Sequence, residues 1–258
     1  MSSPKKTPEI AIGIDVGGTG IKGAPVDLKT GEFAAERVRI PTPENSTPGA
    51  VAEIVAKIVD SFDLPDAPVG VAFPGPIKHG VVTFIANLDE SWTGTNLVSV
   101  MHEATGRTVA AVNDADAAGY GELHYGAARN TEGVVLVAPL GTGIGSALFV
   151  DGILLPNTEL GHLEIDGHDA ESKASTLARE RENLSYEEWA VRLQRYFSVV
   201  ENLLSPDLIV VGGGVSKSWE KFLPLLHLRA PIVPAALRNR AGIVGASWLA
   251  AQEEIATS

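Results

Sequence analysis

A glycine-rich segment near the N-terminus, I-D-V-G-G-T-G-I-K at residues 14–22, has the composition of a phosphate-binding turn. Glycine lets backbone N–H groups approach an anion without obstruction, threonine adds a hydroxyl donor, and lysine adds positive charge. Just before the turn, the carboxylate of Asp15 could hold Mg²⁺, usually through water. A tight hairpin that needs glycine for geometry alone is the competing interpretation. The candidate phosphate ligands of this segment are Gly17, Gly18, Thr19, Gly20 and Lys22.

The string G-T-G-I occurs again at residues 141–144, and this repetition favours phosphate binding over hairpin geometry alone. The second copy offers Gly141, Thr142 and Gly143. Neither copy matches the P-loop string G-x-x-x-x-G-K-[ST] or the dinucleotide fingerprint G-x-G-x-x-G at the start of a helix. A third glycine run, Gly212, Gly213 and Gly214, follows an apolar segment and could admit a nucleotide or distal phosphates at a helix N-terminus. A tight strand-to-helix turn explains that run equally well.

Two polar segments could bind and activate a sugar. In V-N-D-A-D-A-A-G, residues 112–119, one aspartate could accept a proton from a hydroxyl while Asn113 orients the substrate. Either Asp114 or Asp116 could instead be a helix cap. In N-T-E-L-G-H-L-E, residues 157–164, Glu159 and His162 offer the donors and acceptors that ring hydroxyls require. A single loop histidine is more commonly a surface residue.

Hydrophobic periodicity predicts the elements that position these residues. An amphipathic helix begins at Pro48 after the N-cap Thr47, with apolar residues at helical spacing from Val51 to Phe62. A second helix is expected at 186–204, a third after the third glycine run, and a last one from about residue 242. Expected strands cover 9–16, 21–28 and 34–40 as an antiparallel meander, then 69–73, 109–112, 134–138, 146–150 and 208–211. Strands followed by helices in both halves, each half with one G-T-G-I hairpin, predict a duplicated α/β fold of two lobes flanking a cleft.

Composition excludes several classes of protein. The chain has 20 Lys+Arg against 32 Asp+Glu, a net charge of −12, which argues against nucleic-acid binding. It has no cysteine, which removes disulfides and Cys-ligated metal sites. The uncharged run 133–150 contains Pro139 and three glycines in its middle, so it predicts two strands rather than a membrane span. The N-terminal lysines precede no apolar core, so we expect no secretory signal and a cytoplasmic protein.

Taken together, the motifs resemble the sugar-kinase branch of the ROK family, within the actin-like ATPase (ribonuclease H-like) fold. Within that branch they are most similar to bacterial polyphosphate/ATP-dependent glucokinases and glucomannokinases. We expect a small N-terminal lobe of residues 1–113 plus 242–258 and a large C-terminal lobe of residues 114–241. The matching strings run in family order over nearly the whole chain: I-D-V-G-G-T-G-I-K, S-W-T-G-T-N, N-D-A-D-A-A-G, L-G-T-G-I-G-S, P-N-T-E-L-G-H-L-E, and residues 232–237 leading into A-G-I-V-G-A.

The resemblance implies transfer of phosphate from polyphosphate, ATP or both to the 6-hydroxyl of glucose, with Mg²⁺ as cofactor and mannose as a second candidate substrate. It makes Asp114 the general base and places Gly212 to Gly214 at the nucleotide or distal-phosphate end. It also implies a homodimer. Many family members carry a zinc-binding cysteine cluster after the G-H segment, whereas the cysteine-free form is typical of the polyphosphate-using branch, so no zinc is expected. The sugar ligands implied are Asn87, Asn113, Asp114, Glu159, His162 and, from a gapped alignment, Glu171.

Three alternatives stay open. The first is an ATP-specific ROK kinase for another hexose. The second is a sugar-sensing ROK regulator, which would place a helix-turn-helix before the first hairpin. That hairpin begins at about Gly13 here, and we expect no such domain. The third, a non-catalytic actin-like scaffold, would need neither Asn113 and Asp114 nor the Glu159 and His162 loop. If the donor is polyphosphate, positive charge must gather locally, and the candidates are Lys22, Arg129, Lys217, Arg238 and Arg240.

Overall fold

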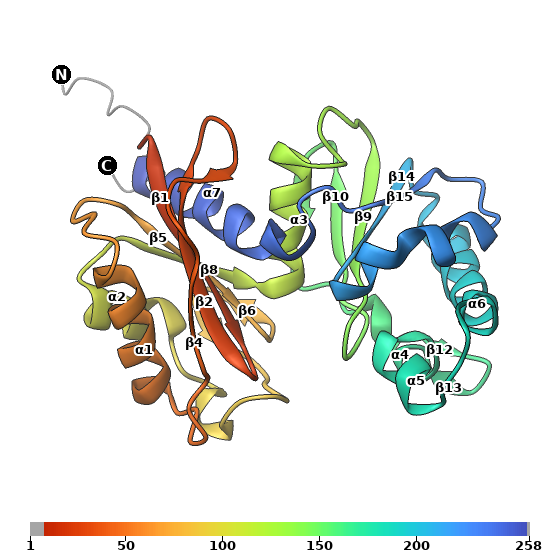
Figure 1. The fold of residues 1–258 in the computed structure, drawn as a ribbon, viewed down its shortest axis with the longest axis horizontal. Coiled ribbons are helices and arrows are strands. Elements are labelled where there is room, and N and C mark those ends of the chain that lie inside the picture. The colour runs from red at the N-terminus through yellow and green to blue at the C-terminus, as the bar shows by residue number, and fades with distance from the viewer. Residues whose placement is uncertain (1–7, 257–258) are drawn as a thin grey trace. The chain divides into compact units, whose positions relative to one another are not determined.

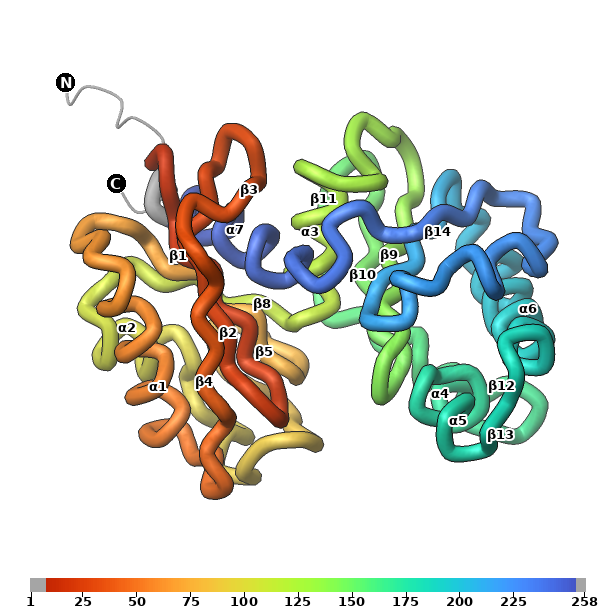
Figure 2. The backbone as a smooth tube through the Cα atoms, in the orientation of Figure 1, coloured from red at the N-terminus to blue at the C-terminus, as the bar shows by residue number. Residues whose placement is uncertain are grey.

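The computed structural model describes residues 8–256, and these form two compact units (Figures 1 and 2). The N-terminal unit consists of two segments, the chain up to Gly121 and the chain from Ala241 onward. The C-terminal unit is Glu122–Arg240. The first crossing falls inside helix α3 (Asp114–Tyr125) and the second just before helix α7 (Ala241–Ala256). Asp114, the first residue of α3, therefore belongs to the N-terminal unit.

The N-terminal unit contains a six-stranded sheet in the order β3-β2-β1-β5-β8, with β4 also paired to β2. β1 and β2 are antiparallel, whereas β1, β5 and β8 run parallel. The strand predicted at 69–73 is confirmed. The strand predicted at 34–40 is confirmed only over Val38–Ile40, which pairs antiparallel with one end of β2, while a separate short strand, Glu32–Phe33, pairs with the other end. The bounds are β1 Ile10–Gly17, β2 Gly20–Asp27, β3 Glu32–Phe33, β4 Val38–Ile40, β5 Val69–Phe73 and β8 Val109–Asn113.

The sheet of the C-terminal unit repeats this topology. Its order is β11-β10-β9-β14-β15, with β9 and β10 antiparallel and β9, β14 and β15 parallel. Each sheet thus consists of a hairpin followed by two parallel strands, which confirms the duplication that the repeated hairpin predicted. The bounds are β9 Val134–Pro139, β10 Ala147–Val150, β11 Ile153–Leu155, β14 Leu208–Gly212 and β15 Ile232–Pro234.

The predicted helices at 48–62 and 186–204 are confirmed as α1 (Pro48–Asp60) and α6 (Tyr186–Leu204). Ser185 and Glu188 form a capping box at the start of α6, which buries an apolar face in the core of its unit. The helix predicted after the third glycine run is wrong. Gly214–Lys221 is a 3₁₀ segment interrupted by the non-helical backbone of Ser218. The remaining elements are α2 (Leu97–Thr105), α4 (Glu171–Ala174), α5 (Thr176–Arg181), the hairpin of β6 (Ile77–Lys78) with β7 (Val81–Val82), the hairpin of β12 (Glu164–Ile165) with β13 (His168–Asp169), and short 3₁₀ turns.

The two faces of the N-terminal sheet carry side chains of different size. Alternate residues of β1 and β5 place large apolar side chains in the core with α1 and α2, while α7 covers the other face (Figure 1). On the α7 face, a Cβ at Gly13 would overlap the carbonyl of Ile243, and a Cβ at Gly70 would overlap the carbonyl of Ala246. These glycines let the backbone of α7 rest directly on the sheet.

Within residues 8–256, the structure contains no helix that combines the length and apolar character needed to span a bilayer. The uncharged run 133–150 forms β9, β10 and the turn between them, as the sequence predicted.

We predict that Gly70→Ala lowers the free energy of unfolding by about 1–3 kcal/mol, because the added methyl group has to displace the α7 backbone. Urea unfolding followed by circular dichroism measures the change. Gly49→Ala is the matched control, since no atom lies within 4 Å of a Cβ at Gly49 in the first turn of α1. That control should leave stability unchanged or raise it by up to about 1 kcal/mol. If Gly70→Ala is as stable as the wild type, α7 packs less closely against the sheet than the structure shows.

Candidate active site

The first glycine turn joins β1 to β2. Gly17 pairs with Gly20 across the ladder, so Gly18 and Thr19 form an exposed tip. Side chains from outside hold the turn: a guanidinium nitrogen of Arg39 donates to the Thr19 carbonyl at 2.9 Å, and the Thr42 hydroxyl donates to the Gly17 carbonyl. Both contacts are made to carbonyl oxygens of the turn. An anion can therefore bind the N–H groups of the turn while these contacts are in place.

Asp15 and Lys22 face each other across β1 and β2 beside this turn. The Lys22 ammonium lies 2.9 Å from Oδ2 of Asp15, and both side chains are about one-quarter to one-third exposed, at 30% and 25%. A partly exposed carboxylate at this place fits the oxygen-ligand preference of Mg²⁺. Lys22 supplies positive charge at the same place.

The second glycine turn lies between β9 and β10, with Gly141 and Thr142 exposed. Again the support comes from outside the turn. Oε2 of Glu171, the first residue of α4, accepts the Ile144 N–H at 2.9 Å, and the Leu177 N–H of α5 donates to the Gly141 carbonyl at 3.1 Å. The two G-T-G-I segments therefore have the same sequence, and each is contacted by residues from other parts of its own unit.

The third glycine run lies directly beside the second turn. The Leu140 N–H donates to the Gly212 carbonyl at 3.1 Å, because β14 runs parallel to β9 and ends next to it. Gly213 has φ +80° and a Cβ there would overlap the Leu140 backbone, so geometry alone requires glycine at this position. Around a Cβ at Gly214, by contrast, no atom lies within 4 Å. Gly214 thus has space for a ligand to approach.

Asn113 and Asp114 end β8 and begin α3. Oδ1 of Asn113 accepts the N–H groups of Ala115 and Asp116 at 2.8 and 3.3 Å, so Asn113, only 8% exposed, caps the helix. Asp114 is exposed, and its Oδ1 accepts the Ala115 N–H at 2.8 Å. Asn113 therefore provides the cap, and Asp114 shares the Ala115 N–H with it while its side chain lies at the surface.

The topology of the N-terminal sheet brings the candidate residues of that unit to one edge. β1, β5 and β8 are parallel, so the glycine turn after β1 and Asp114 after β8 lie at the same ends of their strands. Asn87 is exposed, and a Cβ on Gly18 would lie 3.4 Å from its carbonyl oxygen. The turn, Asn87 and Asp114 therefore belong to one end of this sheet.

In the C-terminal unit, Glu159, His162 and Glu171 interact through their charges. Glu159 precedes the 3₁₀ turn Leu160–His162, and the Glu171 carboxylate lies against Gly143 and Gly161. Desolvation raises the pKa of Glu159, and the charge of Glu171 acts in the same direction, whereas His162 opposes both. A carboxyl group with a raised pKa becomes protonated, and so able to donate a hydrogen bond, at a higher pH than a free glutamate.

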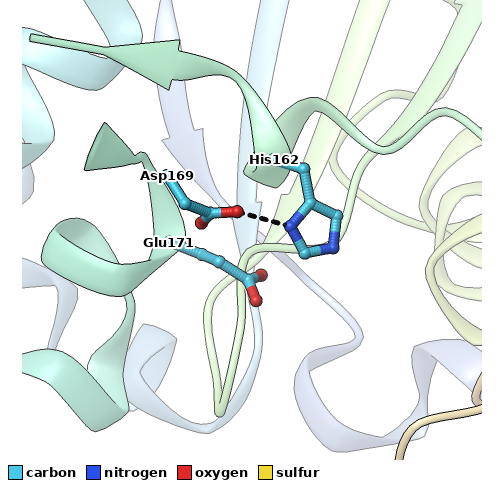
Figure 3. A group of neighbouring side chains, drawn as sticks. All are labelled: His162, Asp169 and Glu171. Atoms are coloured by element: carbon cyan, nitrogen blue, oxygen red, sulfur yellow. Dashed lines mark hydrogen bonds and ion pairs between the residues drawn. The ribbon is translucent and has the colours of Figure 1, made fainter. Parts of the chain in front are cut away.

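His162 also forms an ion pair with Asp169, whose Oδ2 lies 2.8 Å from Nδ1 of the ring (Figure 3). Ligand atoms of His162, Asp169 and Glu171 all lie within 4.8 Å of one another, a spacing that could admit a cation. Both carboxylates already accept hydrogen bonds, Asp169 from His162 and Glu171 from the Ile144 N–H. The cluster is therefore satisfied by its own contacts.

Sequence reasoning missed four residues that shape this region. Arg39 and Thr42 hold the first turn, Asp169 holds His162, and Glu122 is fully buried. Oε2 of Glu122 accepts the N–H groups of Ala127 and Ala236 at 2.7 and 3.0 Å, and Oε1 accepts that of Leu237 at 2.8 Å. The dipeptide Asp166-Gly167 is a hairpin signal that could have predicted the return of the chain to His162. The contacts of Glu122 with Ala236 and Leu237 span more than 100 positions and give no local signal.

The duplicated sheet topology, with a glycine turn after the first strand of each sheet, defines an α/β protein of the actin-like ATPase sugar-kinase class. The ROK family model matches residues 11–176, and the chain belongs to the ROK family.

Relatives of the chain include the polyphosphate glucokinase of Mycobacterium tuberculosis, which is 48% identical over 236 residues that cover 91% of this chain and 89% of the relative. Among solved structures, the inorganic polyphosphate/ATP-glucomannokinase of Arthrobacter sp. strain KM is 56% identical, with a TM-score of 0.89 over 97% of this chain and 99% of that one. A ROK family glucokinase of Streptomyces griseus, solved with glucose and AMPPNP, shares the fold at 24% identity, with a TM-score of 0.80 over 94% of this chain and 99% of that one.

We predict that Glu171→Ala speeds hydrogen exchange of the Ile144 amide by about 10- to 100-fold, because a hydrogen bond to a charged acceptor contributes about 1.5–3 kcal/mol. NMR-detected exchange resolves this amide. Glu180→Ala removes an exposed carboxylate of neighbouring α5 and should leave the Ile144 rate unchanged. An unchanged rate in Glu171→Ala would mean that the second turn is rigid without its outside support.

Proposed function

We propose that this protein is a hexokinase-type phosphotransferase that makes glucose 6-phosphate, and mannose 6-phosphate, from inorganic polyphosphate or ATP. The main support for this proposal is the pair of glycine turns, each held by residues outside the turn, together with the exposed carboxylate of Asp114 directly after β8. The similarity to a polyphosphate glucokinase and to a polyphosphate/ATP-glucomannokinase supports the choice of substrates.

In this proposal the two turns bind the phosphates of the donor. Gly17, Gly18, Thr19, Gly20 and Lys22 form one set of ligands, and Gly141, Thr142 and Gly143 form the other. Magnesium, when bound, neutralises the negative charge of the donor phosphates, and Asp15 would hold it through water. The supporting observation is the partly exposed carboxylate of Asp15 beside the first turn.

Asp114 is the proposed general base. It accepts the proton of the sugar 6-hydroxyl while that oxygen attacks the terminal phosphorus, and the bond from this phosphorus to the remaining donor breaks. As the first residue of α3, Asp114 lies at the positive end of the helix dipole, which favours its ionised form. An ionised carboxylate at this place can both orient the hydroxyl and receive its proton.

The sugar ring is held, in this proposal, by Asn87, Asn113, Glu159, His162 and Glu171. Their side chains supply both donors and acceptors, as ring hydroxyls require. Mannose differs from glucose in the configuration of one hydroxyl group, so both sugars can present the same 6-hydroxyl to Asp114.

Polyphosphate needs further positive charge beyond the two turns. The 3₁₀ segments Gly214–Lys221 and Arg238–Arg240 contact each other, and together they carry Lys217, Arg238 and Arg240. Arg238 has a left-handed backbone, with φ 55°, an uncommon conformation that clusters at functional sites. We propose that these cations, which follow the third glycine run, bind distal phosphates.

The family resemblance leads us to propose as well that the enzyme is a cytoplasmic homodimer. Light scattering on the purified protein tests the dimer directly.

We predict that initial rates with Mg²⁺ show phosphate transfer to glucose and mannose from both ATP and long polyphosphate. If about three cations bind distal phosphates, the polyphosphate rate should fall with salt with a log–log slope of about −2, more steeply than the ATP rate. Transfer to neither sugar from either donor would overturn the proposed function. Equal salt slopes for the two donors would overturn only the distal cation site.

We predict that Asp114→Asn lowers kcat by about 10²- to 10⁴-fold, since the amide keeps the shape of the side chain but cannot accept a proton. Glucose affinity, measured by calorimetry, should stay close to that of the wild type. Asp66→Asn is a suitable control, because Asp66 is exposed on a loop of the same unit. Near-wild-type kcat in folded Asp114→Asn would remove Asp114 from the role of base.

A further inference from the structure

The imidazole of His162 is oriented by a carboxylate that the proposed chemistry does not otherwise use. Nδ1 of His162 lies 2.8 Å from Oδ2 of Asp169 (Figure 3). The Asp169 carboxylate is itself constrained, because its Oδ1 accepts the Ser172 N–H at 3.4 Å and the Ser172 hydroxyl donates to the Asp169 carbonyl at 2.6 Å. Asp169 is thus held at its side chain and at its backbone.

A tight hairpin brings Asp169 back to His162. β12 and β13 pair with Glu164 opposite Asp169, and the two turn residues, Asp166 and Gly167, have φ values of 54° and 76°. Two consecutive left-handed residues are typical of a type I′ turn, which closes the hairpin in two residues. Arg195 of α6 binds both carboxylate oxygens of Asp166, at 2.9 and 2.7 Å. The hairpin therefore has a defined register and a contact that ties its tip to a long helix.

We propose that Asp169 is a positioning residue that fixes the ring rotation of His162 and keeps a proton on Nδ1, so that Nε2 is presented to a sugar hydroxyl. In a neutral imidazole one nitrogen donates and the other accepts, and the partner of one nitrogen sets the state of the other. The inference rests on the proposed function, because it assigns the sugar to the Nε2 side of the ring.

The charges around His162 are consistent with this arrangement. The hydrogen bond that His162 donates to Asp169 raises the pKa of His162, partial burial opposes the rise, and the charges of Glu171, Asp169 and Glu159 add to it. Because the folded-state pKa is raised, the stabilisation from this pair is complete below the pKa of an unfolded histidine and is lost as pH rises through the folded pKa. Charged His162 donates from both nitrogens, so the ring offers Nε2–H to the sugar over a wider pH range than a free histidine.

Two substitutions separate the charge of Asp169 from its hydrogen bond. Asp169→Asn keeps the shape and one acceptor oxygen, whereas Asp169→Ala removes both the charge and the acceptor. Asp166→Asn is the matched control, since it removes the same charge from the same hairpin at a residue that pairs with Arg195 instead of His162, and asparagine tolerates the left-handed backbone there. Thermal unfolding of each variant checks that it is folded.

The first measurement is an NMR titration of the His162 ring nitrogens between about pH 5 and 8, in protein without sugar or donor. We predict that Asp169→Asn lowers the pKa of His162 and that Asp169→Ala also moves part of the proton from Nδ1 to Nε2. Asp166→Asn should leave both properties as in the wild type. If His162 keeps its pKa and tautomer in folded Asp169→Asn and Asp169→Ala, the inference is overturned, whatever the activity of these variants.

The second measurement is steady-state kinetics. Loss of one positioned hydrogen bond predicts a glucose KM raised by about 5- to 10-fold in Asp169→Ala, with a smaller change in kcat. An altered tautomer with an unchanged glucose KM would overturn the role of Asp169 in sugar binding. A glucose KM unchanged in His162→Ala would instead contradict the proposed sugar site itself. A stoichiometric metal ion, whose removal by a chelator reproduces the kinetics of Asp169→Ala, would replace this inference with a metal site.

Discussion

A glycine turn that binds an anion must leave backbone N–H groups accessible, and its glycines have no side chains that could add to the few backbone contacts within the turn, such as the Gly141 N–H to the Gly143 carbonyl at 3.0 Å. Most of the features described above follow from this constraint. In each unit additional support comes from outside the turn: Arg39 and Thr42 contact the first turn, whereas Glu171 and the start of α5 contact the second. These supports lie 20 to 36 positions along the chain from the turns, so each turn receives them only when its unit has folded.

The sheets place these turns beside the other functional groups. Parallel strands end at one edge of a sheet, so the first turn shares an edge with Asp114, and the second turn shares one with the third glycine run. In the N-terminal unit this edge also depends on α7, whose backbone rests on Gly13 and Gly70. In the C-terminal unit, buried Glu122 connects the end of α3 to the loop after β15, because it accepts the N–H groups of Ala236 and Leu237 as well as that of Ala127.

The sequence predicted the parts of this structure that carry local signals. β5 and α1 were predicted closely, because an uninterrupted apolar run and a capped amphipathic pattern each have one simple interpretation. The predicted helix after Gly214 failed because apolar spacing there does not reveal the non-helical backbone of Ser218. The glycine turns were found through their repeated string. Arg39 and Glu122 were missed because a contact with a distant backbone group leaves no pattern in the residues around it.

The central claim is that both glycine turns bind the phosphates of the donor through their backbone N–H groups. The most direct test is an NMR titration of ¹⁵N-labelled protein with tripolyphosphate and Mg²⁺, without sugar, so that no transfer occurs. The account predicts saturable shifts of the amides of residues 18–20 and of residues 141–143. Saturable shifts confined to surface lysines and arginines, with both turns unaffected, would contradict it.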